Sequence, residues 1–258
     1  MFHHQEATQV TPGGPDDPET LHHLAEHYGY PDTADRPYVR ANMIATVDGA
    51  AALAGRSGTL GGPGDRAVFR TLRGRCDVVL VGSGTAVAEN YRQPAVDPPF
   101  AGLRRALGQR AAPALAVVSG SLHLDPAYPP LGNAATVILT CRAAPPDRRH
   151  ALAGAGATLV DCGDDTVDPA TAVDVLHRQG LSRILCEGGP TLLGSLIGAD
   201  LVDELCLTIS PALAAGTASR IATGATPPVL RELRPTQILG DDDGYLYTRW
   251  TRHTGGDH

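Results

Sequence analysis

The stretch that decides the fold is DVVLVGSGTAV at residues 77–87, where an apolar run leads directly into a glycine turn. An apolar run without in–out alternation is typical of a strand buried on both faces, and such strands indicate a parallel sheet covered by helices. Gly82 and Gly84 let backbone N–H groups approach a ligand, and Thr85 opens the next element, where a helix N-terminus favours a phosphate. The alternative is an ordinary strand–helix turn, which a short glycine motif does not exclude.

Apolar runs and helical patterns alternate on both sides of this stretch. The last two apolar runs flank GDDDG, a turn sequence, and are expected to form an antiparallel hairpin at a sheet edge. The fold class is therefore predicted to be α/β, with a mostly parallel central sheet, helices on both faces and a C-terminal antiparallel hairpin. Strands are predicted at 38–46, 77–82, 114–119, 135–140, 157–161, 183–186, 203–210, 235–240 and 244–250, and helices at 64–74, 145–154, 168–179 and 190–199.

The chain of 258 residues favours one large α/β domain over two small ones. Residues 1–35 are expected to form a leader with one short, weak helix over 17–28, and the polar residues 1–16 are expected to be frayed. Residues 36–252 are predicted to form the single domain, followed by a disordered tail at 253–258. The irregular run at 97–113 is interpreted as a surface excursion that includes a short helix.

The composition excludes several classes of protein. All 21 basic residues are arginine, so Schiff-base enzymes, pyridoxal-phosphate enzymes and Walker-A hydrolases, which need a lysine, are excluded. The net charge of −7 argues against a nucleic-acid binder but leaves room for an anionic small molecule held by local arginines. Five cysteines without C-x-x-C spacing make a disulfide framework or a metal site improbable. Without a spanning segment or signal-peptide pattern, a cytoplasmic protein that does not bind membranes is predicted.

A second glycine loop, EGGPTLLGSL at residues 187–196, follows another buried strand. Glu187 stands at the carboxyl end of that strand, where open α/β sheets bind ligands. The glycines leave room for a ligand, and the proline suits a first helical turn with free N–H groups. Two such loops at one sheet edge favour a diphosphate site, although a tight turn with a surface glutamate is the simpler alternative. The residues expected around the diphosphate are Gly188, Gly189, Pro190 and Thr191.

The segment between the first strand and the first domain helix contains further candidates. ATVDGAA at residues 45–51 ends the strand with an Asp-Gly turn, and a glycine-rich loop at 55–65 follows, as a mobile lid or as a plain connection. Arg66, Arg70 and Arg73 then lie on one side of the helix at helical spacing. For Arg66 and Arg70, a solvated charged face is the preferred interpretation.

Four segments taken together resemble the reductase domain of the bifunctional riboflavin deaminase–reductase and its stand-alone relatives. They are RPYVRANMIATVDG (36–49), LRGRCDVVLVGSGTAV (72–87), CEGGPTLLGSLI (186–197) and LVDELCLTISPALAAG (201–216). The resemblance implies a dihydrofolate-reductase-like fold, NADPH as hydride donor, and a homodimer. It also implies a ribosylamino-pyrimidine 5′-phosphate as substrate, whose open-chain imine is reduced at C1′ to the ribitylamino product. The zinc signature of the deaminase domain is missing from this chain, which is therefore expected to be a reductase only.

The same resemblance implies roles for individual residues. Asp48 and Glu187 are the candidates to orient the substrate or to relay a proton, although a structural role is open for each. The expected cofactor contacts are Thr46, Thr59, Gly82, Gly84, Thr85, Glu89, Ser119, Gly188, Gly189, Pro190, Thr191 and Leu192. The expected substrate contacts are Ser57, Arg73, Arg92 and Glu187.

One family motif is missing. The family's phosphate-gripping Asp-Pro-x-Leu-Thr-x-Arg is replaced here by ENYRQPAV at residues 89–96, in which Arg92 is the candidate substitute. Ser119 and Arg142 follow apolar strands and are the candidates for the 2′-phosphate of NADPH. The altered motif leaves two alternative functions open: a dihydrofolate or pterin reductase, and a non-catalytic nucleotide-binding module.

Overall fold

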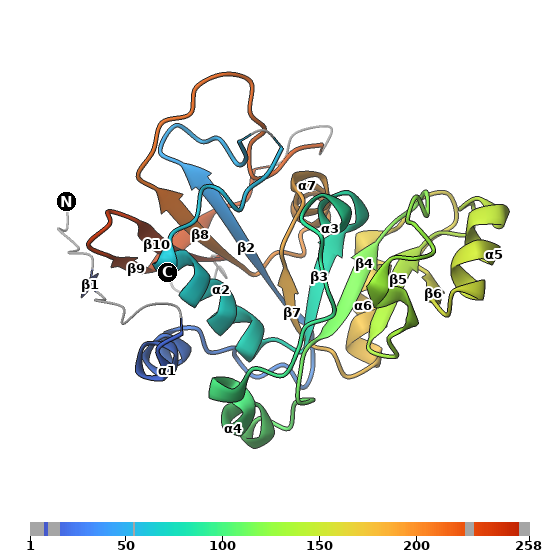
Figure 1. Cartoon of the computed structure of the whole chain (residues 1–258), viewed down its shortest axis with the longest axis horizontal. Coiled ribbons are helices and arrows are strands. Elements are labelled where there is room, and N and C mark those ends of the chain that lie inside the picture. Colours follow the sequence, from blue (N-terminus) through green and yellow to red (C-terminus); the bar gives the residue numbers. More distant parts are fainter. Residues whose placement is uncertain (1–7, 10–15, 54, 225–229, 253–258) are drawn as a thin grey trace, which may run out of the picture.

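The computed structural model describes residues 8–9, 16–53, 55–224 and 230–252. Its strands form one ten-stranded sheet in the order β1-β9-β10-β8-β2-β7-β3-β4-β5-β6 (Figure 1). The strands are β1 (Thr8–Gln9), β2 (Tyr38–Thr46), β3 (Val78–Gly82), β4 (Ala114–Val118), β5 (Thr136–Thr140), β6 (Thr158–Asp161), β7 (Arg183–Cys186), β8 (Glu204–Ser210), β9 (Leu233–Gly240) and β10 (Leu246–Arg252).

The predicted mixed sheet is confirmed. The seven strands from β8 to β6 run parallel to one another, and β10 is antiparallel to both β8 and β9. The hairpin of β9 and β10 lies toward one end of the sheet, where only the two-residue strand β1 pairs with the outer side of β9. Thr8 and Gln9 belong to the leader that was expected to be frayed, whereas residues 1–7, 10–15 and 253–258 lie outside the described residues.

The helices cover both faces of the sheet, as predicted, and six of them begin at a proline, whose missing N–H costs nothing in the first turn. They are α1 (Pro18–His27), α2 (Pro63–Arg75), α3 (Ser83–Ala88), α4 (Pro98–Ala106), α5 (Pro146–Gly154), α6 (Pro169–Arg178) and α7 (Pro190–Gly198), with a 3-10 turn at Pro129–Gly132. The excursion expected at 97–113 contains α4. Helix α3 was not predicted as an element with bounds, because six residues are too few to show helical periodicity.

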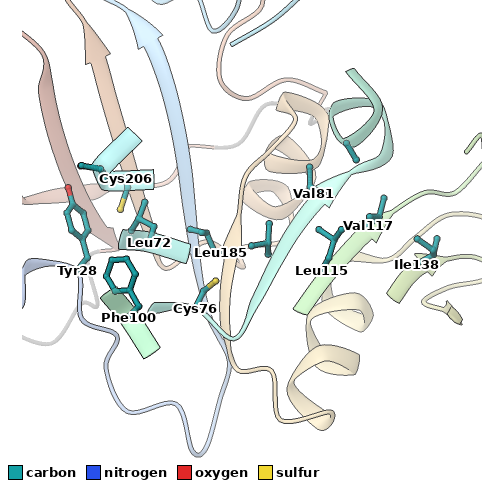
Figure 2. Packing of buried hydrophobic residues seen from close by; sticks show 14 of the residues in the cluster. Tyr28, Leu72, Cys76, Val81, Phe100, Leu115, Val117, Ile138, Leu185 and Cys206 are labelled. Carbon is teal, nitrogen blue, oxygen red and sulfur yellow. The ribbon is translucent and has the colours of Figure 1, made fainter. Parts of the chain in front are cut away.

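Two apolar cores lie on opposite faces of the sheet, and the strands alternate between them. In β3, Val79 and Val81 belong to the core under α1, α2 and α4, whereas Val78 and Leu80 belong to the core under α6 and α7. Figure 2 shows the first core, where Tyr28, Leu72 and Phe100 meet side chains of the central strands. Both faces of β3 are therefore buried, which explains its uninterrupted apolar sequence.

The leader helix α1 is tied to the sheet through buried charges. Arg40 and Glu204 are both fully buried and form an ion pair with 2.7 Å between Nε and Oε1. The guanidinium of Arg40 also donates to the carbonyls of Tyr28 and Gly29, at 2.8 and 2.7 Å. Arg249 pairs with the same glutamate and donates to the carbonyl of His27. Since buried cations need such partners, the C-terminal end of α1 stabilises the charges of the sheet.

We expect Leu21→Ala, in α1, to lower the free energy of unfolding by about 2–5 kcal/mol, because the side chain is 0% exposed and its removal leaves a cavity. Urea denaturation of the full chain measures this change. The control is Leu213→Ala, at a side chain that is 80% exposed, where a change of less than about 0.5 kcal/mol is expected. Equal stability of the two variants would mean that α1 does not contribute to the core.

Candidate active site

The two glycine loops predicted from the sequence meet side by side. Gly82 ends β3 and Gly188 follows β7, and these strands are neighbours in the sheet. The backbone N–H of Gly82 donates to the carbonyl of Gly188 at 2.8 Å. A Cβ on Gly189 would lie 2.3 Å from the hydroxyl oxygen of Thr85, so a larger residue would force Thr85 or the loop to shift. Gly188 has a φ of +83°, a conformation that glycine adopts without strain.

The two loops enclose a cavity of about 390 Å³, here called the glycine cavity. Helices α3 and α7 both begin at its edge, and neither N-terminus has a side-chain cap, so first-turn N–H groups are left for a ligand. Apolar side chains of β4 and α6 line the remainder, and no lining residue is charged. The lining includes the predicted cofactor residues Gly82, Gly84, Thr85, Gly189, Pro190, Thr191 and Leu192, and Ser195 of the same predicted loop, together with Ser83, Val118 and Val173, which were not predicted.

A second cavity of about 570 Å³ is here called the arginine cavity. Glu187 lines it and immediately precedes the glycines of the first cavity. Helix α3 contributes to both, since residues of its first turn line the glycine cavity while Glu89, its C-cap, lines the arginine cavity. The charged residues of this second lining are Asp65, Arg66, Arg73, Glu89, Arg92 and Glu187.

Arg73 and Glu187 are predicted substrate residues, and the structure joins them directly. Nε and Nη2 of Arg73 donate to Oε1 and Oε2 of Glu187 at 2.8 and 2.7 Å. The hydroxyl of Tyr91 donates to Oε2 of the same carboxylate at 2.6 Å. Tyr91 was not predicted, because no local pattern links it to a residue 96 positions away.

The charges of this cluster are fixed by their surroundings. Burial disfavours the Arg73 cation, but the charge and hydrogen bonds of Glu187 outweigh burial, so the pKa of Arg73 is raised. Burial, reinforced by the charge of Glu187, raises the pKa of Tyr91 well above its usual value. Tyr91 therefore remains a protonated donor at neutral pH, and the cluster presents one oriented carboxylate to the cavity.

Glu89 and Ser57 contact each other. Oε1 of Glu89 accepts from the backbone N–H of Ser57 at 2.9 Å and from its hydroxyl at 3.1 Å. Both residues line the arginine cavity, so Glu89 lies with the predicted substrate contacts. This pair fastens the glycine-rich loop to the C-terminal end of α3. The predicted cofactor role of Glu89 stays a prediction.

Asp48 lies outside the lining of both cavities. Its carboxylate accepts from the hydroxyl of Thr46 and from the backbone N–H groups of Ala214 and Ala215. These bonds lower the pKa of Asp48 to about 2, with the largest effect from Thr46. Asp48 is therefore ionised at neutral pH and links the turn after β2 to the loop after β8 by hydrogen bonds. Its predicted catalytic role stays a prediction.

Thr59 and Ser119 also lie outside both linings. Ser119 is buried next to the lining residue Val118, and its hydroxyl has no hydrogen-bond partner among the described residues. Arg142 forms an exposed ion pair with Asp164. The described residues contain no cluster of His, Cys, Asp and Glu arranged to hold a metal. Among the helices described, none combines the length and apolarity that crossing a membrane requires.

The comparisons with known proteins converge on one family. A model of the RibD C-terminal domain matches residues 37–247. The 2,5-diamino-6-ribosylamino-4(3H)-pyrimidinone 5′-phosphate reductase of Methanothermobacter thermautotrophicus is 31% identical over 220 residues, which cover 83% of this chain and 98% of the relative. The protein of that name from Archaeoglobus fulgidus is 28% identical, and the match covers 83% of this chain and 97% of the relative. The solved structure of a pyrimidine reductase-like protein from Corynebacterium diphtheriae has a TM-score of 0.78 and 27% identity, covering 89% of this chain and 98% of that one.

We expect Arg73→Met to lower the free energy of unfolding by about 3 kcal/mol, because Glu187, whose side chain is 2% exposed, then loses its counter-charge. A second substitution, Glu187→Gln, removes the unpaired charge and is expected to restore part of that loss. Urea denaturation of both variants measures the coupling between the two side chains.

The control is Arg142→Met, which breaks an exposed ion pair and is expected to cost less than about 1 kcal/mol. If the double variant is no more stable than Arg73→Met alone, the loss does not come from the charge of Glu187.

Proposed function

The chain belongs to the RibD C-terminal domain family, and we propose that it is an NADPH-dependent reductase of a ribosylamino-pyrimidine 5′-phosphate in riboflavin biosynthesis. The family match confirms the resemblance predicted from the sequence. The observation that carries the proposal is that one loop lines both cavities, with Gly189 in the uncharged glycine cavity and Glu187 in the charged one. One cavity suits a dinucleotide and the other a small phosphorylated substrate.

The residues of the glycine cavity fit a dinucleotide diphosphate. The hydrogen bond between Gly82 and Gly188 brings two uncapped helix N-termini to one cavity, and their N–H groups favour an anion. Hydroxyls of Ser83, Thr85 and Thr191 line the same space, and apolar side chains of β4 and α6 offer a slot for a flat ring. When bound, NADPH supplies the hydride. Ser119 and Arg142 remain the candidates for its 2′-phosphate.

The arginine cavity fits the substrate. Arg66 and Arg92 line it without a salt-bridge partner among the described residues, which leaves both guanidinium groups for the 5′-phosphate. Arg92 thus takes the place of the missing phosphate motif. Arg66, interpreted from the sequence as a solvated residue, is exposed but lies on the rim of this cavity. Among the described residues, Oε1 of Glu187 accepts from Nε of Arg73 only, so it retains capacity for an N–H group of the pyrimidine.

The reduction adds a hydride to C1′ of the open-chain imine and a proton to the imine nitrogen. The protein's first task is to hold the two reactants in one geometry, which makes the transfer effectively unimolecular. Glu187 and Arg73 orient the substrate because each fixes the other, and Tyr91 prevents the carboxylate from rotating. The glycine loops hold the cofactor directly beside this carboxylate.

We expect the purified chain to oxidise NADPH when supplied with 2,5-diamino-6-ribosylamino-4(3H)-pyrimidinone 5′-phosphate, and NADH more slowly. Absorbance at the nicotinamide band follows the reaction, and mass spectrometry identifies the ribitylamino product. Oxidation of NADPH with dihydrofolate instead would establish the pterin-reductase alternative. Binding of NADPH without turnover of any pyrimidine or pterin would favour the non-catalytic module.

We expect Gly189→Ala to weaken NADPH binding by about tenfold or more, or about 1.4 kcal/mol, because the new methyl group collides with Thr85 and displaces the loop. Isothermal titration measures the affinity. Gly154→Ala is the matched control, since a Cβ at that position meets nothing within 4 Å and lies in α5, away from both cavities. Unchanged NADPH affinity in Gly189→Ala would remove the glycine loops from the cofactor site.

The predicted homodimer and the cytoplasmic location stay predictions. The side chains of Leu207, Ile209 and Trp250 support the dimer, because they are half-buried and belong to neither of the two cores. The pairing of β8 with β10 places Leu207 and Ile209 opposite Thr248 and Leu246 on one face of the sheet. We propose this face as the contact with a second copy.

A further inference from the structure

The reaction needs a proton donor, and two of the three carboxyl groups in the arginine cavity are already engaged. Glu187 is held by Nε and Nη2 of Arg73 and by the hydroxyl of Tyr91. Glu89 accepts from the backbone and hydroxyl of Ser57. Both carboxyl groups therefore already serve as acceptors for donors of the protein itself.

The third carboxyl group, Asp65, has different surroundings. It lies in the first turn of α2, is half-buried, and lines the same cavity as Glu187. It has no salt-bridge partner among the described residues, and hydrogen bonding to the side chain of Thr208, on β8, acts to lower its pKa. Gly61 packs against the carboxyl group so closely that a Cβ there would lie 2.3 Å from Oδ2.

These surroundings favour the protonated form of Asp65. Burial raises the pKa of its carboxyl group, and the hydrogen bond from Thr208 and the charge of Arg66 oppose this only in part. The other titratable groups nearby are Tyr247, on β10, and Asp241, which accepts a hydrogen bond from the Tyr247 hydroxyl. Asp65 thus keeps its proton to a higher pH than an ordinary aspartate, as a general acid requires.

We propose that Asp65 is the general acid that protonates the imine nitrogen during the reduction, an assignment that rests on the proposed function. The hydride forms the new C1′–H bond, and the electron pair of the C=N π bond takes the proton from the Asp65 O–H to form N–H. The substrate is reduced by two electrons and NADPH is oxidised to NADP⁺. Asp65 is left as a carboxylate and regains its proton from water.

The test compares Asp65→Asn with wild type in NADPH oxidation. Asn keeps the shape of the side chain and an acceptor for Thr208 but carries no acidic proton. We expect kcat to fall about 100-fold or more, while the Kd for NADPH changes less than threefold. The matched control, Asp147→Asn, changes an exposed aspartate in the first turn of α5, outside both cavities, and is expected to keep wild-type kcat.

The pH profile separates an acid from a structural residue. Because the acid must be protonated, wild-type kcat is expected to fall as pH rises through the raised pKa of Asp65. This fall is expected to vanish in Asp65→Asn and to persist, at a displaced pH, in Asp65→Glu. Should Asp65→Asn fail to fold, the profile of Asp65→Glu decides: a displaced limb supports the proposal and an unchanged limb overturns it.

Retention of kcat within threefold in Asp65→Asn would also overturn the proposal. The same is true if the wild-type alkaline limb persists in that variant. These results are distinguishable from failure of the proposed function, in which wild type itself would not oxidise NADPH with the ribosylamino-pyrimidine phosphate.

Discussion

The site depends on one backbone hydrogen bond, from the N–H of Gly82 to the carbonyl of Gly188. Because β3 and β7 are adjacent and parallel, their carboxyl ends reach the same edge of the sheet, and this bond joins the two loops that follow. No side chain takes part, so the loops can approach as closely as backbone allows. This contact therefore places the starts of α3 and α7 next to each other, with Glu187 beside them.

The features that could be predicted from the sequence are those formed by residues close together in the chain. The long strands and helices were predicted to within about two residues, because their apolar periodicity reflects burial on one or both faces. The glycine loops were predicted because strand, glycine and helix start are consecutive in the chain. By contrast, Tyr91 and Asp65 could not be singled out, because their partners are distant in the sequence. Tyr91 interacts with Glu187, and Asp65 interacts with Thr208. Asp48 was singled out by its place at a strand end, but its partners, on the loop after β8, were not visible.

The leader helix shows the same limitation on a larger scale. From composition, residues 1–35 looked peripheral, and the family match begins only at residue 37. Yet the carbonyls at the end of α1 accept from Arg40 and Arg249, two cations that share the buried Glu204. The sequence did contain one indication of this role. Arg40 lies within the apolar strand β2, and a buried arginine requires partners from elsewhere in the chain. The segment outside the family match therefore completes the interior of the sheet.

The cations of the arginine cavity have a consequence for how the proposed substrate is attracted. Arg66, Arg73 and Arg92 supply the positive charge of this lining, and Glu187 favours the charged form of Arg73. A phosphate monoester, however, gains its second negative charge near pH 6. For the 5′-phosphate substrate proposed above, this second ionisation strengthens the attraction to the three arginines.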